Sequence, residues 1–232
     1  MNATESDVRQ LLRGVDRVII DGATQPSDGL STIRTLFTAA ESAGVALTDF
    51  ALLRQGRWRD SIATMFDEES ASPFLNAINA ISIDYSAGKG VSPSINVVRP
   101  AYHVAWLASR LNATIKTPLH HGNGTGWQAQ LHDQLRHPIA VELCPVDSVL
   151  GAGTTIAVRI AADRRGDHFE LEVRADSTST RAIAKINGAV VHERTFQAPR
   201  WTETTLLSES LEFGEVDPLS PAILRTMSAL IG

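Results

Sequence analysis

Apolar residues in the first half of the chain recur at intervals of three and four, which is the spacing of one face of an α-helix. The clearest stripe consists of Leu30, Ile33, Phe37 and Ala40, and it ends at Gly44. The same spacing predicts further helices over residues 6–12, 57–66 and 101–112. The first half of the chain is therefore expected to be rich in helices.

A short apolar run over residues 17–21 precedes the first of these stripes and is stopped by Gly22. A run of this length, bounded by a turn residue, is typical of a buried strand. Ser27 or Asp28 would then cap the helix that follows. A strand followed by an amphipathic helix is the first half of a βαβ unit. Turn-forming residues predict a loop at 86–94.

The second half of the chain changes to the period of two that strands with one buried face show. Asn187-Gly188 predicts a tight hairpin, because both central residues of a type I′ turn need positive φ. Arg165-Gly166-Asp167 is a weaker hairpin candidate. Strands are predicted over residues 80–85, 127–131, 139–144, 155–161, 169–173, 182–186 and 190–196, and helices over 202–213 and 218–230. This order predicts an α+β fold, a mixed sheet with an antiparallel meander in its C-terminal half and helices packed on it.

The composition is that of a single globular domain over residues 1–232. Of the 232 residues, 43% are hydrophobic and 20% are charged, which excludes disordered and collagen-like chains. The net charge of −5 disfavours binding to nucleic acid or to anionic membranes, and no apolar run approaches the roughly 20 residues of a spanning helix. The single cysteine, Cys144, and a polar N-terminus without a signal-peptide pattern make the cytoplasm the expected compartment.

One glycine-rich segment offers candidate ligand chemistry. Gly122 and Gly124 belong to a Gly-Asn-Gly-Thr-Gly run that directly follows His120 and His121. Backbone amides of such a loop can bind phosphate, and imidazoles can bind zinc. The run matches neither a dinucleotide fingerprint nor a P-loop, and adjacent histidines on an extended segment point to opposite sides. A turn with exposed histidines is the simpler interpretation, so neither a metal nor a cofactor is expected.

The densest basic and aromatic cluster runs over residues 54–59. Tryptophan and arginine dominate the hot spots of protein interfaces, so Arg54, Trp58 and Arg59 are candidates for contact with a partner. The alternative is that Trp58 packs in the core while the arginines pair with nearby aspartates such as Asp49.

The sequence contains no catalytic signature. The GxSxG turn of a serine nucleophile is absent. Cys144 lies in an apolar strand pattern and has no cationic neighbour in the sequence that would lower its pKa. We therefore expect Cys144 to be a small buried hydrophobic residue and not a nucleophile.

The chain nevertheless resembles a known family. The segments that carry the resemblance, in the same order and spacing, are Asp-Arg-Val-Ile-Ile-Asp at 16–21, Asp49, Arg54, Trp58-Arg59, Phe66-Asp67 and Ala-Trp-Leu-Ala-Ser-Arg-Leu at 105–111. They are similar to the C-terminal domain of OpcA, the glucose-6-phosphate dehydrogenase assembly protein of bacteria. Leu52 stands where that family usually has tryptophan, and Phe50 replaces a leucine, which a packed core tolerates. The family's usual N-terminal domain and the redox-sensing cysteine pair of some photosynthetic members have no counterpart in this chain.

The resemblance implies a non-catalytic protein of the oxidative pentose phosphate pathway that binds glucose-6-phosphate dehydrogenase. Such a partner acts as an allosteric effector, because binding one conformation or oligomer more tightly shifts the enzyme toward it. Two alternatives stay open. One is an enzyme or ligand-binding protein that uses residues 120–126 for phosphate or metal chemistry. The other is a sensor of sugar phosphate that acts on the dehydrogenase.

Overall fold

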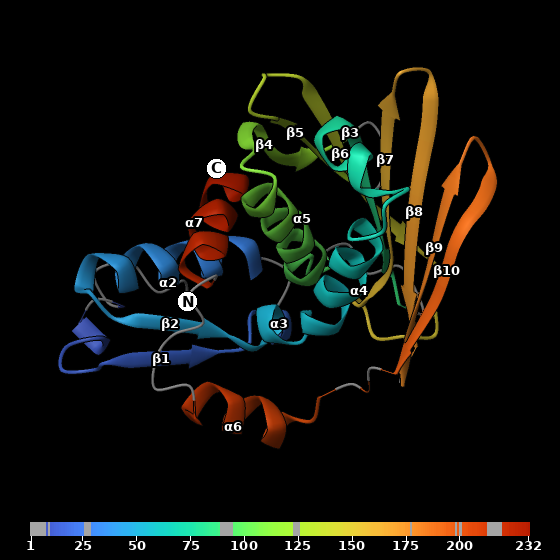
Figure 1. Ribbon diagram of the computed structural model, residues 1–232. Coiled ribbons are helices and arrows are strands. Elements are labelled where there is room, and N and C mark those ends of the chain that lie inside the picture. Colours follow the sequence, from blue (N-terminus) through green and yellow to red (C-terminus); the bar gives the residue numbers. More distant parts are fainter. Residues whose placement is uncertain are drawn as a thin grey trace.

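The structure is a computed structural model that describes residues 8, 10–25, 29–88, 95–122, 126–176, 178–197, 199, 201–212 and 220–232. These residues form a two-stranded sheet and an eight-stranded sheet with helices packed against both (Figure 1). The α+β class expected from the sequence is therefore confirmed. Ser27, Asp28, Gly124 and parts of the predicted segments 6–12, 86–94, 202–213 and 218–230 lie outside the described residues.

The smaller sheet is built from a βαβ unit. Strand β1 (Arg17–Ile20) is followed by helix α2 (Gly29–Ala43) and strand β2 (Ala46–Asp49), and the two strands pair in parallel. The predicted apolar stripe of α2 is buried. Strand β2 was not predicted, because its four residues include only one large apolar side chain, Leu47.

Helix α6 (Glu203–Glu212) lies across the two-stranded sheet from α2 (Figure 1). Arg17, the first residue of β1, donates a hydrogen bond from Nη1 to the carbonyl oxygen of Ser210 in this helix. Leu206 of α6 is fully buried. The C-terminal part of the chain thus returns to complete the layer around β1 and β2.

The larger sheet has the strand order β10-β9-β8-β7-β3-β6-β5-β4. Its strands are β3 (Ile78–Ser86), β4 (Thr114–His121), β5 (Trp127–His132), β6 (Pro138–Val146), β7 (Thr155–Arg164), β8 (Asp167–Ala175), β9 (Ser179–Ile186) and β10 (Ala189–Gln197). Within this sheet, β3 and β6 are the only described strands that pair in parallel. The mixed sheet and its antiparallel meander β7 to β10 agree with the sequence prediction.

Both predicted hairpin turns are present. Asn187 and Gly188 join β9 to β10 with φ values of 50° and 81°, and Arg165 and Gly166 join β7 to β8 with φ values of 53° and 90°. Both pairs therefore occupy the left-handed region that a type I′ turn requires.

Helices cover one face of the large sheet (Figure 1). These are α4 (Gly56–Phe66), α5 (Val98–Arg110) and α7 (Ser220–Ile231), together with the 3-10 helix η2 (Ser72–Ala77). Helix α5 is buried along most of its length, because α7 packs on one side of it and the sheet on the other. None of the described helices has the length and apolar character needed to cross a bilayer.

The opposite face of the sheet carries an ion-pair network across three strands. Arg159 of β7 donates from Nη1 and Nη2 to the two carboxylate oxygens of Asp84 in β3, at 2.9 and 2.7 Å. Its Nε donates to Glu172 of β8 at 2.7 Å, and Glu172 also accepts from Arg174. Because the Asp84 side chain is only 12% exposed, this network is screened less than an ordinary surface pair.

Replacing Arg159 by methionine is expected to lower the free energy of unfolding by about 1–2 kcal/mol. The change leaves the largely buried Asp84 carboxylate without its two-point partner, whereas the methionine keeps the apolar part of the side chain. Urea denaturation measures the effect. Arg181→Met is the matched control, because Arg181 pairs with Glu193 at an exposed site and should cost less than about 0.5 kcal/mol. Equal losses in the two variants would contradict this interpretation.

Candidate functional site

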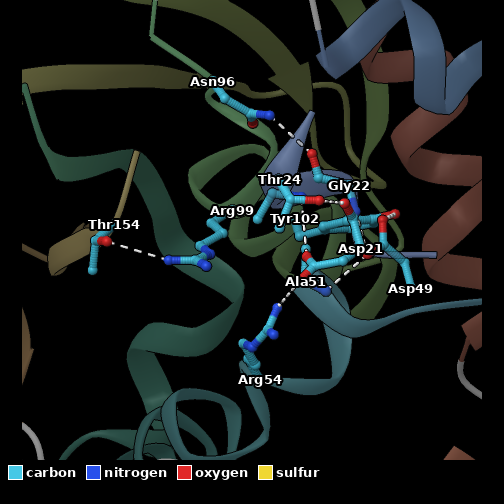
Figure 2. Close-up of polar contacts among 11 residues, drawn as sticks. Asp21, Gly22, Thr24, Asp49, Ala51, Arg54, Asn96, Arg99, Tyr102 and Thr154 are labelled. Carbon is cyan, nitrogen blue, oxygen red and sulfur yellow. Dashed lines mark hydrogen bonds and ion pairs between the residues drawn. The ribbon is translucent and has the colours of Figure 1, made fainter. Parts of the chain in front are cut away.

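A buried aspartate joins the βαβ unit to the central helix α5. Asp49, at the end of β2, is 1% exposed and caps the short helix α3 (Phe50–Leu53). Its Oδ1 accepts hydrogen bonds from the backbone N–H groups of Gly22 and Ala51, at 3.0 and 2.8 Å. Its Oδ2 accepts from the hydroxyl of Tyr102 in α5, at 2.8 Å (Figure 2). The carboxylate therefore fixes three segments that are far apart in the sequence.

The burial of this carboxylate affects its ionisation. Desolvation raises the pKa of Asp49 from 3.8 to about 6, although its three hydrogen bonds act in the opposite direction. Burial and the neighbouring Asp49 also raise the pKa of Tyr102 well above its usual value, so the phenol remains a donor. Gly22 has no room for a side chain, since a Cβ there would lie 2.6 Å from Asp49 Oδ2.

The first interface candidate, Arg54, lies at the C-terminal end of α3 beside this aspartate. Its Nη1 is 2.6 Å from Oδ2 of Asp21, which caps the 3-10 helix η1 (Gly22–Thr24) (Figure 2). The partner of Arg54 is thus an aspartate 33 positions earlier in the chain, and not Asp49.

The other two interface candidates belong to α4. Trp58 is 5% exposed, and its ring meets the ring of His103 edge to face with centroids 5.3 Å apart. The tryptophan is therefore part of the core, as the alternative sequence interpretation had it. Arg59 is half-buried, and its positive charge contributes to the lowered pKa of His103.

Arg54, Trp58 and His103 are part of the lining of a pocket of about 180 Å³. It lies where the α3–α4 turn and α5 meet the beginning of β7. Arg54, Arg57 and Arg99 are among the residues that line it, and its lining among the described residues includes no carboxylate. Arg99 donates from Nη1 to Oγ1 of Thr154 across the pocket, at 3.2 Å (Figure 2). The arrangement favours a negatively charged occupant.

Several buried polar atoms of the residues that line the pocket lack a hydrogen-bond partner among the described residues. They are Oε1 of Gln55, both ring nitrogens of His103 and Oγ1 of Thr155. The three side chains are buried, at 3%, 0% and 6% exposure. Burial, and secondarily the charge of Arg59, lowers the pKa of His103 to about 3, so the imidazole is neutral. A neutral imidazole offers one donor and one acceptor.

The described residues of the histidine and glycine segment, 120–122 and 126, form no comparable site. His120 and His121 end strand β4, and they point to opposite faces of the sheet because His120 pairs with Gln128 and His121 with Trp127. The rings of His121 and Trp127 are in contact, with centroids 4.0 Å apart. Gly122 donates its N–H to the carbonyl oxygen of Gly126. The described part of the chain contains no cluster of three or more potential metal ligands.

Cys144 lies on the face of the sheet that carries the ion-pair network. It is partly buried in β6, with its Sγ 3.9 Å from Oγ of Ser82. Desolvation raises the pKa of this thiol, which lowers its reactivity as a nucleophile.

A comparison with protein families identifies the group to which this fold and sequence belong. A family model described as the C-terminal domain of the glucose-6-phosphate dehydrogenase subunit, of the OpcA type, matches residues 45–220. The chain belongs to this family. The matched region of this OpcA domain includes Asp49, the interface candidates, the pocket and the whole of the large sheet. No curated protein sequence matches the chain at a significant level.

Oxidoreductases are among the solved structures that share the fold of this OpcA domain. A putative oxidoreductase from Klebsiella pneumoniae is similar with a TM-score of 0.57 at 12% identity, over 97% of this chain and 70% of that one. A 3-ketoreductase from Actinomadura kijaniata has a TM-score of 0.54 at 14% sequence identity, and the match covers 99% of this chain and 73% of that one. UDP-N-acetylglucosamine 3-dehydrogenase from Acidithiobacillus ferrooxidans has a TM-score of 0.53 at 11% sequence identity, and the match covers 98% of this chain and 72% of that one. At these identities the likeness shows the fold alone, which does not carry an activity.

Sequence reasoning missed most of the residues that build the OpcA domain's pocket. Arg54 and Trp58 stood out because basic and aromatic residues are dense there, but Gln55, Arg99, His103 and Thr155 have no local signal. The sequence did contain one signal for Asp49. This residue follows a short apolar segment and precedes a run of apolar residues, which is the position of a helix cap.

Proposed function

We propose that this OpcA domain is a non-catalytic partner of glucose-6-phosphate dehydrogenase that promotes the enzyme's oligomeric or active state, with the cytoplasm as its compartment. The observation that carries the proposal is the family match over residues 45–220, whose description names a subunit of that dehydrogenase. The action follows from linkage. A protein that binds one oligomer or conformation more tightly shifts the enzyme toward it by no more than the difference in binding free energy.

Titration of the dehydrogenase of the same organism with the purified chain tests this role. We expect the specific activity to change and to level off at a stoichiometric ratio, because each binding site on the enzyme is filled once. An unrelated NADP-dependent dehydrogenase serves as the control and should not respond. A specific activity that stays constant over a broad titration, from substoichiometric to large excess, would rule the proposal out for this chain.

Two charge reversals locate the proposed contact. We propose that the partly exposed arginines of the 54–59 segment contribute to it, because Trp58 itself is buried. Arg59→Glu should then weaken the effect on the dehydrogenase by at least tenfold. Arg181→Glu makes the same charge change on the helix-free face of the large sheet, at a side chain that is 58% exposed, and should leave the effect within about twofold. If Arg181→Glu weakens the effect at least tenfold and Arg59→Glu does not, the contact lies on the helix-free face of the large sheet.

A further inference from the structure

Helix α6 carries an exposed apolar stripe beside the face that packs on the rest of the domain. Leu206 and Ser210 form the packed face, at 0% and 5% exposure. Leu207 and Leu211, each one position further along the chain, are 45% and 61% exposed. Residues four positions apart share one face of a helix, so the two exposed leucines lie next to each other. Together they form one apolar stripe on the surface.

Exposed apolar side chains are concentrated in this part of the chain. Ten large apolar side chains are exposed among the described residues, and three of them, Trp201, Leu207 and Leu211, lie within residues 201–211. Single exposed apolar residues are ordinary on a protein surface, whereas a concentration of them marks a contact surface. Residues 201–211 are therefore a candidate surface for contact with another protein.

Local contacts hold α6 in its helical form without a partner. Thr202 lies directly before the helix, and its Oγ1 accepts a hydrogen bond from the backbone N–H of Thr205 at 3.1 Å, which is an N-cap. Arg17 of β1 donates to the carbonyl oxygen of Ser210 near the other end of the helix. A helix that is already formed loses little conformational entropy when its apolar face enters a groove. The helix is thus suited to recognition as a preformed unit.

The charges around the leucines indicate the kind of protein that covers them. Helix α6 contains Glu203 and Glu209 and has no lysine or arginine in its sequence. A second copy of the chain would bring the same carboxylates to the contact, and like charges across an interface disfavour association. Charge complementarity therefore favours a different protein, with an apolar groove bordered by lysine or arginine side chains.

The position of α6 connects it to the proposed contact with the dehydrogenase. Trp201 lines the same pocket as Arg54 and Arg57, which belong to the 54–59 segment. From there the helix runs along strand β1 (Figure 1). One partner surface can therefore contact both the 54–59 segment and the leucines of α6.

We propose that residues 201–211 form a docking surface for glucose-6-phosphate dehydrogenase, with Leu207 and Leu211 in an apolar groove that has a basic border. The inference rests on the proposed function, because the occupant is the enzyme itself. It adds the part of the chain that the enzyme contacts and the chemistry of the enzyme's groove.

Isothermal titration calorimetry of the purified chain with the dehydrogenase tests the docking surface. Leu207→Gln/Leu211→Gln should weaken binding at least tenfold and change the melting temperature of the chain by no more than about 2 °C, because both side chains are exposed. Leu135→Gln/Val190→Gln is the matched control. It removes two side chains that are 75% and 56% exposed at the end of the large sheet away from α6, and it should leave the affinity within about twofold (Figure 1).

A charge reversal tests the basic border of the groove. Glu209→Lys should weaken binding at least fivefold, because a lysine then faces lysine or arginine side chains. Glu142→Lys makes the same change on the helix-free face of the large sheet, where Glu142 lies on the same side of β6 as Cys144, and should leave the affinity within about twofold. Unchanged or tighter binding by Glu209→Lys would overturn the basic border.

The outcomes separate this inference from the proposed function. A wild-type chain that forms no complex with the dehydrogenase would overturn both. A wild-type complex whose affinity is unchanged by Leu207→Gln/Leu211→Gln would overturn the docking surface alone. Light scattering of the isolated chain adds a further test, since a dimer that the same variant abolishes would show that a second copy covers the leucines.

Discussion

Replacing Asp49 by alanine is expected to lower the free energy of unfolding by about 2–4 kcal/mol at pH 7. The change leaves two buried backbone N–H groups and the Tyr102 hydroxyl without their acceptor and removes the cap of α3. Part of this loss is offset, because an ionised carboxylate no longer has to be buried. Urea denaturation monitored by circular dichroism measures the difference.

The asparagine variant isolates the ionisation of Asp49. Its side-chain oxygen can still accept from Gly22 and Ala51, so Asp49→Asn should retain most of the stability. The pKa of Asp49 rises from 3.8 in the unfolded chain to about 6 in the folded one, so the folded state binds the proton more tightly. The stability that this group contributes is therefore present below pH 4 and is lost as the pH rises through 6.

The comparison of wild type and Asp49→Asn at pH 4 and pH 7 gives the size of this effect. The wild type should lose about 2 kcal/mol relative to the variant over this range, because most of the effect of the pKa difference, at 1.36 kcal/mol per unit, falls between pH 4 and pH 7. Other titrating groups are common to both proteins and cancel. The contrary result is a difference in the free energy of unfolding between the two proteins that stays constant or changes in favour of the wild type as the pH rises. Either outcome would show that the Asp49 carboxylate is not desolvated as the structure indicates.

Replacing Trp58 by alanine is expected to destabilise the chain by about 3–5 kcal/mol. The side chain is 5% exposed and packs edge to face on His103, so its removal leaves a large cavity between α4 and α5. Trp58→Phe fills most of that space and should cost about 1–2 kcal/mol. Thermal and chemical denaturation of both variants measure these losses.

The phenylalanine variant also distinguishes packing from partner contact. If Trp58 acts only through the fold, Trp58→Phe should retain the affinity of the chain for glucose-6-phosphate dehydrogenase within about twofold. A folded Trp58→Phe protein with at least tenfold weaker binding would instead show that the indole itself contacts the partner.

Elements with a strong local signal were predictable from the sequence. The stripe of α2 buries Ile33 and Phe37 as its spacing requires, and Asn187-Gly188 forms the tight turn that its backbone preferences demand. Strand β4 was missed because it is an edge strand with mostly exposed residues, so the alternation of buried apolar side chains that marks the other strands is nearly absent. Strand β2 and helix α3 were missed because each has only four residues.

The site was less predictable than the fold because it depends on tertiary contacts. Trp58 was singled out by its residue type, but its neighbour His103 is 45 positions away and no local pattern connects the two. The partner of Arg54 is likewise distant, since Asp21 is brought to it by the βαβ unit. Residue type indicates which side chains are notable, whereas only the packing of α3, α4 and α5 shows which of them share a pocket.

The mass of the species formed with glucose-6-phosphate dehydrogenase tests the central proposal most directly. Size-exclusion chromatography with light scattering, on the enzyme alone and on its mixture with the chain, gives that mass. We predict a species whose mass equals an enzyme oligomer plus a fixed number of 25.0 kDa chains, with an enzyme oligomer equal to or larger than that of the enzyme alone. Two separate species at micromolar concentration, with the masses of the unmixed proteins, would contradict it.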